Sequence, residues 1–120
     1  MENINHLIDQ LLGLPFAVGL IFSLVGMLMW LFPPRKINYL YGYRTRSSMA
    51  SQQRWDFAQK YSARLMAVNG LLLVLSSLIK MGFNMSISQQ LTLGVILILA
   101  AVIVLIVLTE KAIQTKFPQA

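Results

Sequence analysis

The chain has 120 residues, of which 57% are hydrophobic and 12% charged, with a formal net charge of +6 at pH 7. Soluble domains carry about 25% charged residues, and a domain of this size buries too little of its surface to hide so many apolar side chains. The composition therefore excludes an ordinary soluble domain, and the absence of cysteine excludes disulfides and thiolate chemistry.

Three long apolar stretches predict membrane-spanning helices, because a helix needs about 20 mainly apolar residues to cross the hydrocarbon core. Leu11–Phe32 and Leu91–Leu108 contain no charged residue, and Leu65–Ile79 extends to Phe83 if Lys80 places its amine at the interface. The first stretch differs from a signal peptide because no Lys or Arg precedes it. We expect an all-α integral membrane protein, a single domain over residues 1–120, with spans at about 11–32, 65–83 and 91–108.

Local signals mark where these helices begin and end. Pro15 falls in the first turn of the first helix, where a missing backbone donor costs little. Pro33 and Pro34 end that helix, since proline cannot continue the hydrogen-bond ladder. Ser88 is the expected N-cap of the third helix.

Few polar residues interrupt the apolar stretches. Intramembrane charges mark ion and proton pathways, and these three stretches hold none apart from Lys80 near one end. We expect Asn69 to form an interhelical hydrogen bond, worth about 0.6–2 kcal/mol, rather than to contact a substrate. Gly19 and Ser23 form a small-residue face for close helix packing, either within one chain or in a homo-oligomer.

Residues 33–64 form a basic loop that holds most of the ten Lys and Arg residues. From Met49 onward its pattern becomes helical, with Ser47 or Ser48 as the expected N-cap. On a helical wheel one side is apolar, and Gln59 falls on the opposite, polar side. We expect an amphipathic helix at the membrane surface before the second span; the alternative is one continuous helix from about Met49 to Phe83.

The charge distribution predicts an orientation. If the basic loop is cytoplasmic, the C-terminal tail with Lys111 and Lys116 is cytoplasmic too, because two crossings separate them. All Lys and Arg residues except Lys80 then face the cell interior, as the positive-inside rule requires. We therefore expect the N-terminus outside and the C-terminus inside. Orientation and anionic lipid headgroups explain the net charge better than direct nucleic-acid binding does.

The inventory of reactive side chains argues against an enzyme. The only histidine, His6, lies near the outer terminus, and the carboxylates Glu2, Asp9, Asp56 and Glu110 are isolated in the sequence. No His, Asp and Glu residues have metal-ligand spacing, and no base accompanies the serines. We expect no catalytic residue, no metal and no cofactor.

The segment around Gly42–Arg46 is the most specific signal in the chain. Arginine forks match phosphate or carboxylate oxygens, although Arg44 and Arg46 could also be ordinary topology determinants. Arg54 falls on the apolar side of the wheel, so it needs a partner, a cation–π contact or a lipid headgroup. We expect a binding or structural site made of the following residues: Gly42, Tyr43, Arg44, Thr45, Ser48, Met49, Arg54 and Trp55.

The segment Gly42-Tyr43-Arg44-Thr45, then Ser48-Met49, Trp55 and Ala58-Gln59-Lys60-Tyr61-Ser62, resembles the signature of the SdpI family of bacterial membrane proteins. The resemblance covers about residues 33–72. Two positions depart from the family pattern: Arg46, where members often have proline, and Ala63, where many have glycine. The namesake proteins carry additional spans ahead of this module, and this chain is similar to the short form.

The resemblance implies an immunity protein of the bacterial inner membrane. The namesake protects a producing cell from its own secreted antimicrobial peptide and holds a transcriptional repressor at the membrane when the toxin is present. Gly42, Arg44, Thr45 and Trp55 would form the core of the shared site. A second hypothesis, drawn from Arg44, Arg46 and Arg54, is a binder or carrier of anionic lipid headgroups; a membrane enzyme acting on lipid or peptide ranks third.

Overall fold

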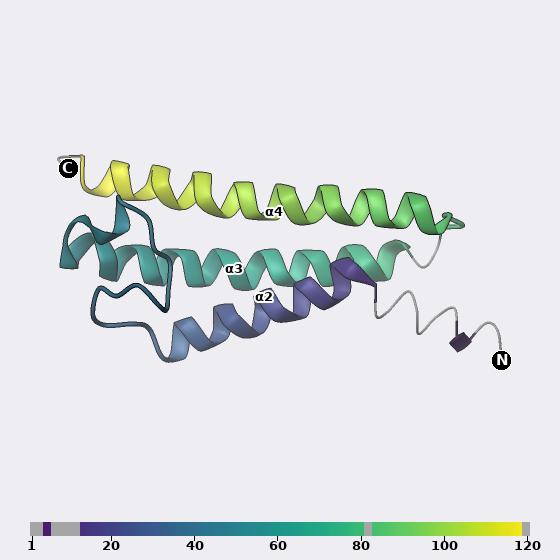
Figure 1. Cartoon of the computed structure of the whole chain (residues 1–120), viewed down its shortest axis with the longest axis horizontal. Coiled ribbons are helices and arrows are strands. Elements are labelled where there is room, and N and C mark those ends of the chain that lie inside the picture. The colour runs from purple at the N-terminus through teal and green to yellow at the C-terminus, as the bar shows by residue number, and fades with distance from the viewer. Residues whose placement is uncertain (1–3, 6–12, 81–82, 119–120) are drawn as a thin grey trace.

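The computed structural model describes residues 4–5, 13–80 and 83–118. In these ranges the chain forms three long helices, α2 (Leu14–Leu31), α3 (Gln52–Lys80) and α4 (Ile87–Lys116), a short 3-10 helix η1 (Ser48–Ala50), and no strand. The helices lie lengthwise in a bundle of 57 × 24 × 19 Å. The basic loop and the end of α4 lie at one end of the bundle, and the α3–α4 connection lies at the other (Figure 1).

Two of the three predicted spans correspond to helices that are long and apolar enough to cross a membrane, α3 and α4. At about 1.5 Å per residue, their 29 and 30 residues reach about 43 and 45 Å. Both lengths exceed the thickness of a hydrocarbon core, about 30 Å. The 18 residues of α2 reach about 27 Å, and α2 is an apolar helix of shorter length.

The separate amphipathic helix expected before the second span is wrong, because α3 runs unbroken from Gln52 to Lys80. No glycine or proline interrupts residues 52–69, so the backbone ladder continues from the polar part into the apolar part. The continuous helix, the alternative considered above, is therefore observed. Its amphipathic segment, 52–64, is the first part of a longer helix.

α2 begins and ends where its prolines predict, but the N-cap of α4 differs from the predicted one. α2 has Pro15 in its first turn and ends at Leu31, just before the proline pair, as predicted. The N-cap of α4 is Ser86 instead of Ser88: Ser86 Oγ accepts from the Gln89 backbone N–H, and the Gln89 side chain accepts from the Ser86 N–H, in a capping box. Ser86 is the N-cap because the backbone N–H groups of Ser86 and Gln89, which lack helical acceptors, are then both hydrogen-bonded.

The N-cap predicted for the helix after the loop is also wrong. Ser47 precedes only the short helix η1 and makes no side-chain cap bond. At α3 the cap is Ser51, whose hydroxyl accepts a 3.1 Å hydrogen bond from the Arg54 N–H. η1 and the extended Ser51 separate the turn from the helix proper.

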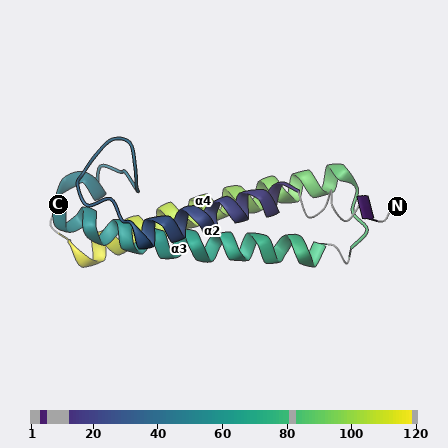
Figure 2. The same cartoon turned by 90° about the horizontal axis from the view of Figure 1, so that it is seen from below.

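α2 packs on α3 through small residues, which lets the two backbones approach closely. A Cβ atom at Gly26 would lie 2.6 Å from the Ala67 backbone nitrogen, and one at Gly70 would lie 2.5 Å from that of Ser23. The face that contains Gly19 and Ser23 is therefore used within the chain. Seen from below, α2 runs obliquely in front of the other two helices (Figure 2).

α4 meets α3 more sparsely than α2 does. In the most apolar window of α4 only 6% of the residues are buried, against 33% for α3. Within the bundle, Asn69 Nδ2 donates to the Ala101 carbonyl at 3.1 Å, which confirms the expected interhelical hydrogen bond. Most of the apolar surface of α4 is therefore exposed.

Candidate functional site

The turn after the tyrosines, Gly42–Ser48, is held against α3 by Gln59; we call this segment the arginine turn. Gly42 has φ 104°, and a Cβ atom there would lie 2.5 Å from Gln59 Oε1 and 2.7 Å from Pro34 Cγ. Glycine is thus required for both conformation and space. The buried Gln59 amide accepts from the Tyr43 N–H at 2.7 Å and donates to the Tyr43 carbonyl at 2.8 Å.

The start of the basic loop is fixed by Trp55. Its ring is fully buried, and its Nε1–H donates to the Pro34 carbonyl at 2.6 Å. Gln52 Nε2 donates to the neighbouring Arg35 carbonyl at 2.6 Å. The first turn of α3 therefore binds the loop by main-chain carbonyls just beyond the end of α2.

The arginine turn closes on itself through Thr45 and Ser48. The Thr45 N–H donates to Ser48 Oγ at 2.8 Å, and the Ser48 N–H donates to Thr45 Oγ1 at 3.1 Å. The Ser48 hydroxyl lies 3.1 Å from the Tyr43 carbonyl, and the Met49 N–H donates to the Thr45 carbonyl at 3.0 Å. Thr45 therefore caps η1, and the buried Ser48 satisfies the interior of the turn.

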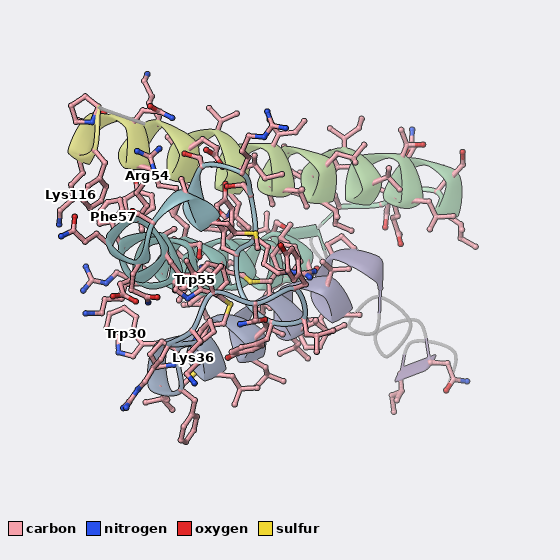
Figure 3. All side chains as sticks on the ribbon, turned by 60° about the vertical axis from the view of Figure 1, so that its left-hand side comes forward. Trp30, Lys36, Arg54, Trp55, Phe57 and Lys116 are labelled. Carbon is pink, nitrogen blue, oxygen red and sulfur yellow. The ribbon has the colours of Figure 1, made fainter. Side chains whose placement is uncertain are left out.

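Arg54 joins the arginine turn to the end of α4. Its side chain is only 3% exposed and lies on the α3 side that faces α4 (Figure 3). Nε donates to the Ser47 carbonyl at 2.8 Å, Nη2 to Ser47 Oγ at 2.7 Å, and Nη1 to the Phe117 carbonyl at 2.7 Å. Phe117 is the C-cap of α4, where carbonyls lack helical donors and carry the negative end of the dipole.

The partner that the apolar position of Arg54 requires is thus a set of oxygens within the chain, rather than an aromatic ring or a lipid headgroup. A guanidinium buried in this way is satisfied by charge-assisted hydrogen bonds. Gln114 of α4 adds a longer contact, with its Nε2 at 3.3 Å from Ser47 Oγ.

Tyr43 makes a second connection between the loop and α4. Its hydroxyl donates to Glu110 Oε1 at 2.9 Å. Burial raises the pKa of the Tyr43 phenol well above its ordinary value of 10.0, and the hydrogen bond and charge of Glu110 raise it further. The phenol is therefore protonated at physiological pH and remains a donor. We call the three links, Tyr43–Glu110, Arg54–Phe117 and Gln114–Ser47, the polar clasp.

Arg44 and Arg46 differ from Arg54 because both are exposed. An open pocket of about 450 Å³ lies between the arginine turn and α4. It is lined by Thr45, Arg46, Ser47, Ala50, Arg54, Glu110 and Gln114. Arg44 does not line it. Asn69 lies apart from this site, between α3 and α4.

The predicted site residues therefore fall into two groups. Most build and hold the turn: Gly42, Tyr43, Thr45, Ser48, Met49, Arg54 and Trp55. Arg44 and Arg46 are presented on its surface. Among the described residues, no group of three or more His, Cys, Asp or Glu side chains could hold a metal ion.

Sequence reasoning missed Gln59 and Glu110 as parts of this site. Gln59 was placed on the exposed side of the helix, yet it is 1% exposed because the loop folds over it. Its place in the quoted signature, between Ala58 and Lys60, was the available signal, because a glutamine side chain can donate and accept at once. Glu110 gave none, because its partner is far away in the sequence.

These features define a small helical protein with two helices able to cross a membrane and a polar turn clasped at one end. The model of the SdpI/YfhL protein family matches residues 35–109, and the chain belongs to that family. The uncharacterized protein YfhL of Bacillus subtilis (strain 168) is 42% identical over 96 residues, which are 80% of this chain and 82% of that protein. No solved structure matches the chain. The family resemblance predicted from the Gly42–Ser62 signature is confirmed.

Proposed function

We propose that the protein is a non-enzymatic immunity or signalling protein of the bacterial inner membrane, which confers resistance to a secreted antimicrobial peptide. Membership of the SdpI/YfhL family supports this role. In the proposed topology α2, α3 and α4 all cross the membrane, with the N-terminus outside and the basic loop and C-terminus inside. The position of the loop and the end of α4 at one end of the bundle is compatible with that topology.

The observation that carries the proposal is the attachment of the arginine turn to both α3 and α4. Gln59 fixes Tyr43 to α3, while Tyr43 and Arg54 reach Glu110 and Phe117 of α4. A toxin that shifts α4 relative to α3 within the membrane would therefore strain or open the polar clasp. The consequence at the cytoplasmic surface is a changed presentation of Arg44 and Arg46, which a transcriptional repressor could read.

Toxin challenge of a sensitive host tests this role. At equal protein levels, the double substitution Arg44→Ala/Arg46→Ala should abolish protection conferred by the intact protein. The matched control is Arg35→Ala/Lys36→Ala, which removes two exposed cations from the same loop, outside the turn. If the Arg44→Ala/Arg46→Ala variant protects as well as the intact chain, these arginines have no part in the mechanism. If both double variants lose protection, the arginines act only as positive charges that orient the loop.

Single cysteines test the topology, because the natural chain has none. Tyr39 is 81% exposed in the basic loop, and Asn84 is exposed in the α3–α4 connection. In intact cells a membrane-impermeant thiol reagent should label Asn84→Cys and spare Tyr39→Cys. The reverse pattern would overturn the orientation.

The alternative function, binding or carriage of anionic lipid headgroups through Arg44, Arg46 and Arg54, has less support at that site. Arg54 is buried, and its donors are occupied by Ser47 and Phe117. Arg44 and Arg46 alone stay exposed for such a ligand. Any strong headgroup site would need cations elsewhere.

A further inference from the structure

A second set of cations lines a groove between the first turns of α3 and the last turns of α4. Two adjoining pockets of about 440 and 400 Å³ share Phe57, Tyr61 and Lys116. Lys60 and Arg64 line the first pocket, and Lys111 lines the second. We call this surface the basic groove. It shares no residue with the pocket beside the arginine turn.

The charge of the basic groove is one-sided. Among the described residues, its cations are Lys60, Arg64, Lys111 and Lys116, and its only lining carboxylate is Asp56. Asp56 already accepts a 2.8 Å hydrogen bond from Gln52 Nε2. A set of like charges around one open groove favours an anion that neutralises them.

Two of the cations are positioned by aromatic rings. Lys116 of α4 reaches across to α3, with Nζ 4.7 Å from the centre of the Phe57 ring (Figure 3). The Arg64 guanidinium lies 4.7 Å above the Trp30 ring of α2. Cation–π contacts hold these two charges in place. The groove is thus pre-arranged from all three helices.

The depth of these cations suits the phosphate level of a lipid leaflet. Arg64 directly precedes the apolar part of α3, and Lys111 follows the apolar part of α4. Lys60 and Lys116 lie about 6–8 Å further along their helices. The cations therefore form two levels at the edge of the hydrocarbon core, where Tyr61 also fits the aromatic belt.

Apolar surfaces lie near the basic groove. Leu108 and Ala112 line the inner side of the second pocket. A further slot of about 270 Å³ lies between α2 and α3, and Trp30 forms one of its walls. Arg64, which lines the basic groove, stacks on Trp30, which lines this slot, so the two lie side by side.

We propose that the basic groove binds the phosphate headgroup of one anionic phospholipid, whose acyl chains enter the apolar slots beside α3. The proposal rests on the proposed membrane placement of the helices and is independent of the immunity role. The bound lipid bridges α3 and α4, which are otherwise sparsely packed, and so sets the position of α4.

Native mass spectrometry of the full chain, released from nanodiscs with equal phosphatidylglycerol and phosphatidylcholine, tests the proposal. The intact protein should retain one phosphatidylglycerol in preference to phosphatidylcholine. Arg64→Gln/Lys111→Gln should lower that retention by about tenfold or more, because each cation near an anionic headgroup adds to binding. Arg44→Gln/Arg46→Gln removes the same charge from the arginine turn and should retain the lipid as the intact chain does.

Equal retention of the two lipids, equal loss in both double variants, or no loss in the groove variant would overturn the proposal. Displacement of the lipid by millimolar inorganic phosphate would identify free phosphate as the ligand and overturn it too. All four groove cations are exposed, so folding should persist; if circular dichroism shows otherwise, Lys60→Gln/Lys116→Gln replaces the first pair. No toxin enters the assay, so its failure leaves the immunity role intact.

Discussion

α2 and α4 attach to α3 in opposite ways. α2 meets it through glycines, with backbones so close that an added Cβ would lie within 3 Å of backbone atoms at Gly26 and Gly70. Among the described residues, α4 is joined to α3 by one hydrogen bond within the bundle, at Asn69, and at its end by the polar clasp and by the contact of Lys116 with Phe57. Close packing resists displacement because dispersion contacts weaken sharply with a small gap. The pair α2–α3 is therefore the fixed frame, and α4 is the element whose position can change.

The largest expected effect is on stability, from the buried Trp55 that holds the basic loop on α3. Trp55→Ala should lower the free energy of unfolding by about 3–5 kcal/mol, the usual cost of removing a buried large aromatic ring, since Trp55 is fully buried and bonded to Pro34. Denaturant titration in micelles, followed by circular dichroism, measures it. The control is Trp30→Ala, whose ring is 53% exposed; equal losses in both variants would contradict the assigned burial.

The α2–α3 interface should respond next most strongly. Gly26→Leu forces a side chain against the Ala67 backbone and should cost about 1–3 kcal/mol, as overpacked sites do, although leucine favours helix more than glycine does. Ala17→Leu makes a similar change on the exposed side of α2 and should be nearly neutral. The same micelle titration compares the two, and equal stability would show that the close approach is not required.

The link between α3 and α4 should be weaker. Asn69→Leu removes the hydrogen bond to Ala101 and should cost about 0.6–1.7 kcal/mol, the range for interhelical bonds in membranes. Spin labels on α3 and α4 should also report a broader distance distribution. Ser76→Ala is the matched control, because that hydroxyl bonds only within α3, to Leu73. An unchanged distribution for Asn69→Leu would show that α4 is held elsewhere.

The smallest effect is a pH-dependent signal from the clasp. Because burial and Glu110 raise the pKa of Tyr43 above 10.0, the stability that its phenol adds is complete below pH 10 and is lost only as pH rises above it. In a pH titration followed by phenolate absorbance, one tyrosine should ionise at a higher pH than the others. Tyr43→Phe should remove that high-pH step, and Tyr39→Phe should leave it. Glu110→Gln should lower the pKa of that high-pH step. An unchanged pKa would contradict the hydrogen bond between Tyr43 and Glu110.

Hydropathy predicted three apolar helical stretches, and α2, α3 and α4 are found there. It could not predict where those helices end. α3 begins at Gln52 because Ser51 caps it, and α4 ends at Lys116 because Pro118 follows its C-cap Phe117. Proline ends α2 in the same way, since Pro33 follows its C-cap Phe32.

The candidate site was predicted in part for a similar reason. Gly42, Thr45 and Trp55 belong to a local signature, and each has a defined structural role in the turn. Gln59 was misplaced because a helical wheel assumes that the polar side faces water. The contacts of Arg54 with Phe117 and of Tyr43 with Glu110 span 63 and 67 residues, beyond the reach of any local pattern.

Many of the contacts that hold the basic loop fall on main-chain atoms: Trp55 binds the carbonyl of Pro34, Gln59 the amide and carbonyl of Tyr43, and Arg54 the carbonyl of Ser47. Main-chain atoms are the same whichever amino acid supplies them. The outward side chains can therefore be exchanged, one recognition surface for another, without loosening the scaffold. Such a design would let related proteins diverge toward different partners while the gripping residues stay constant.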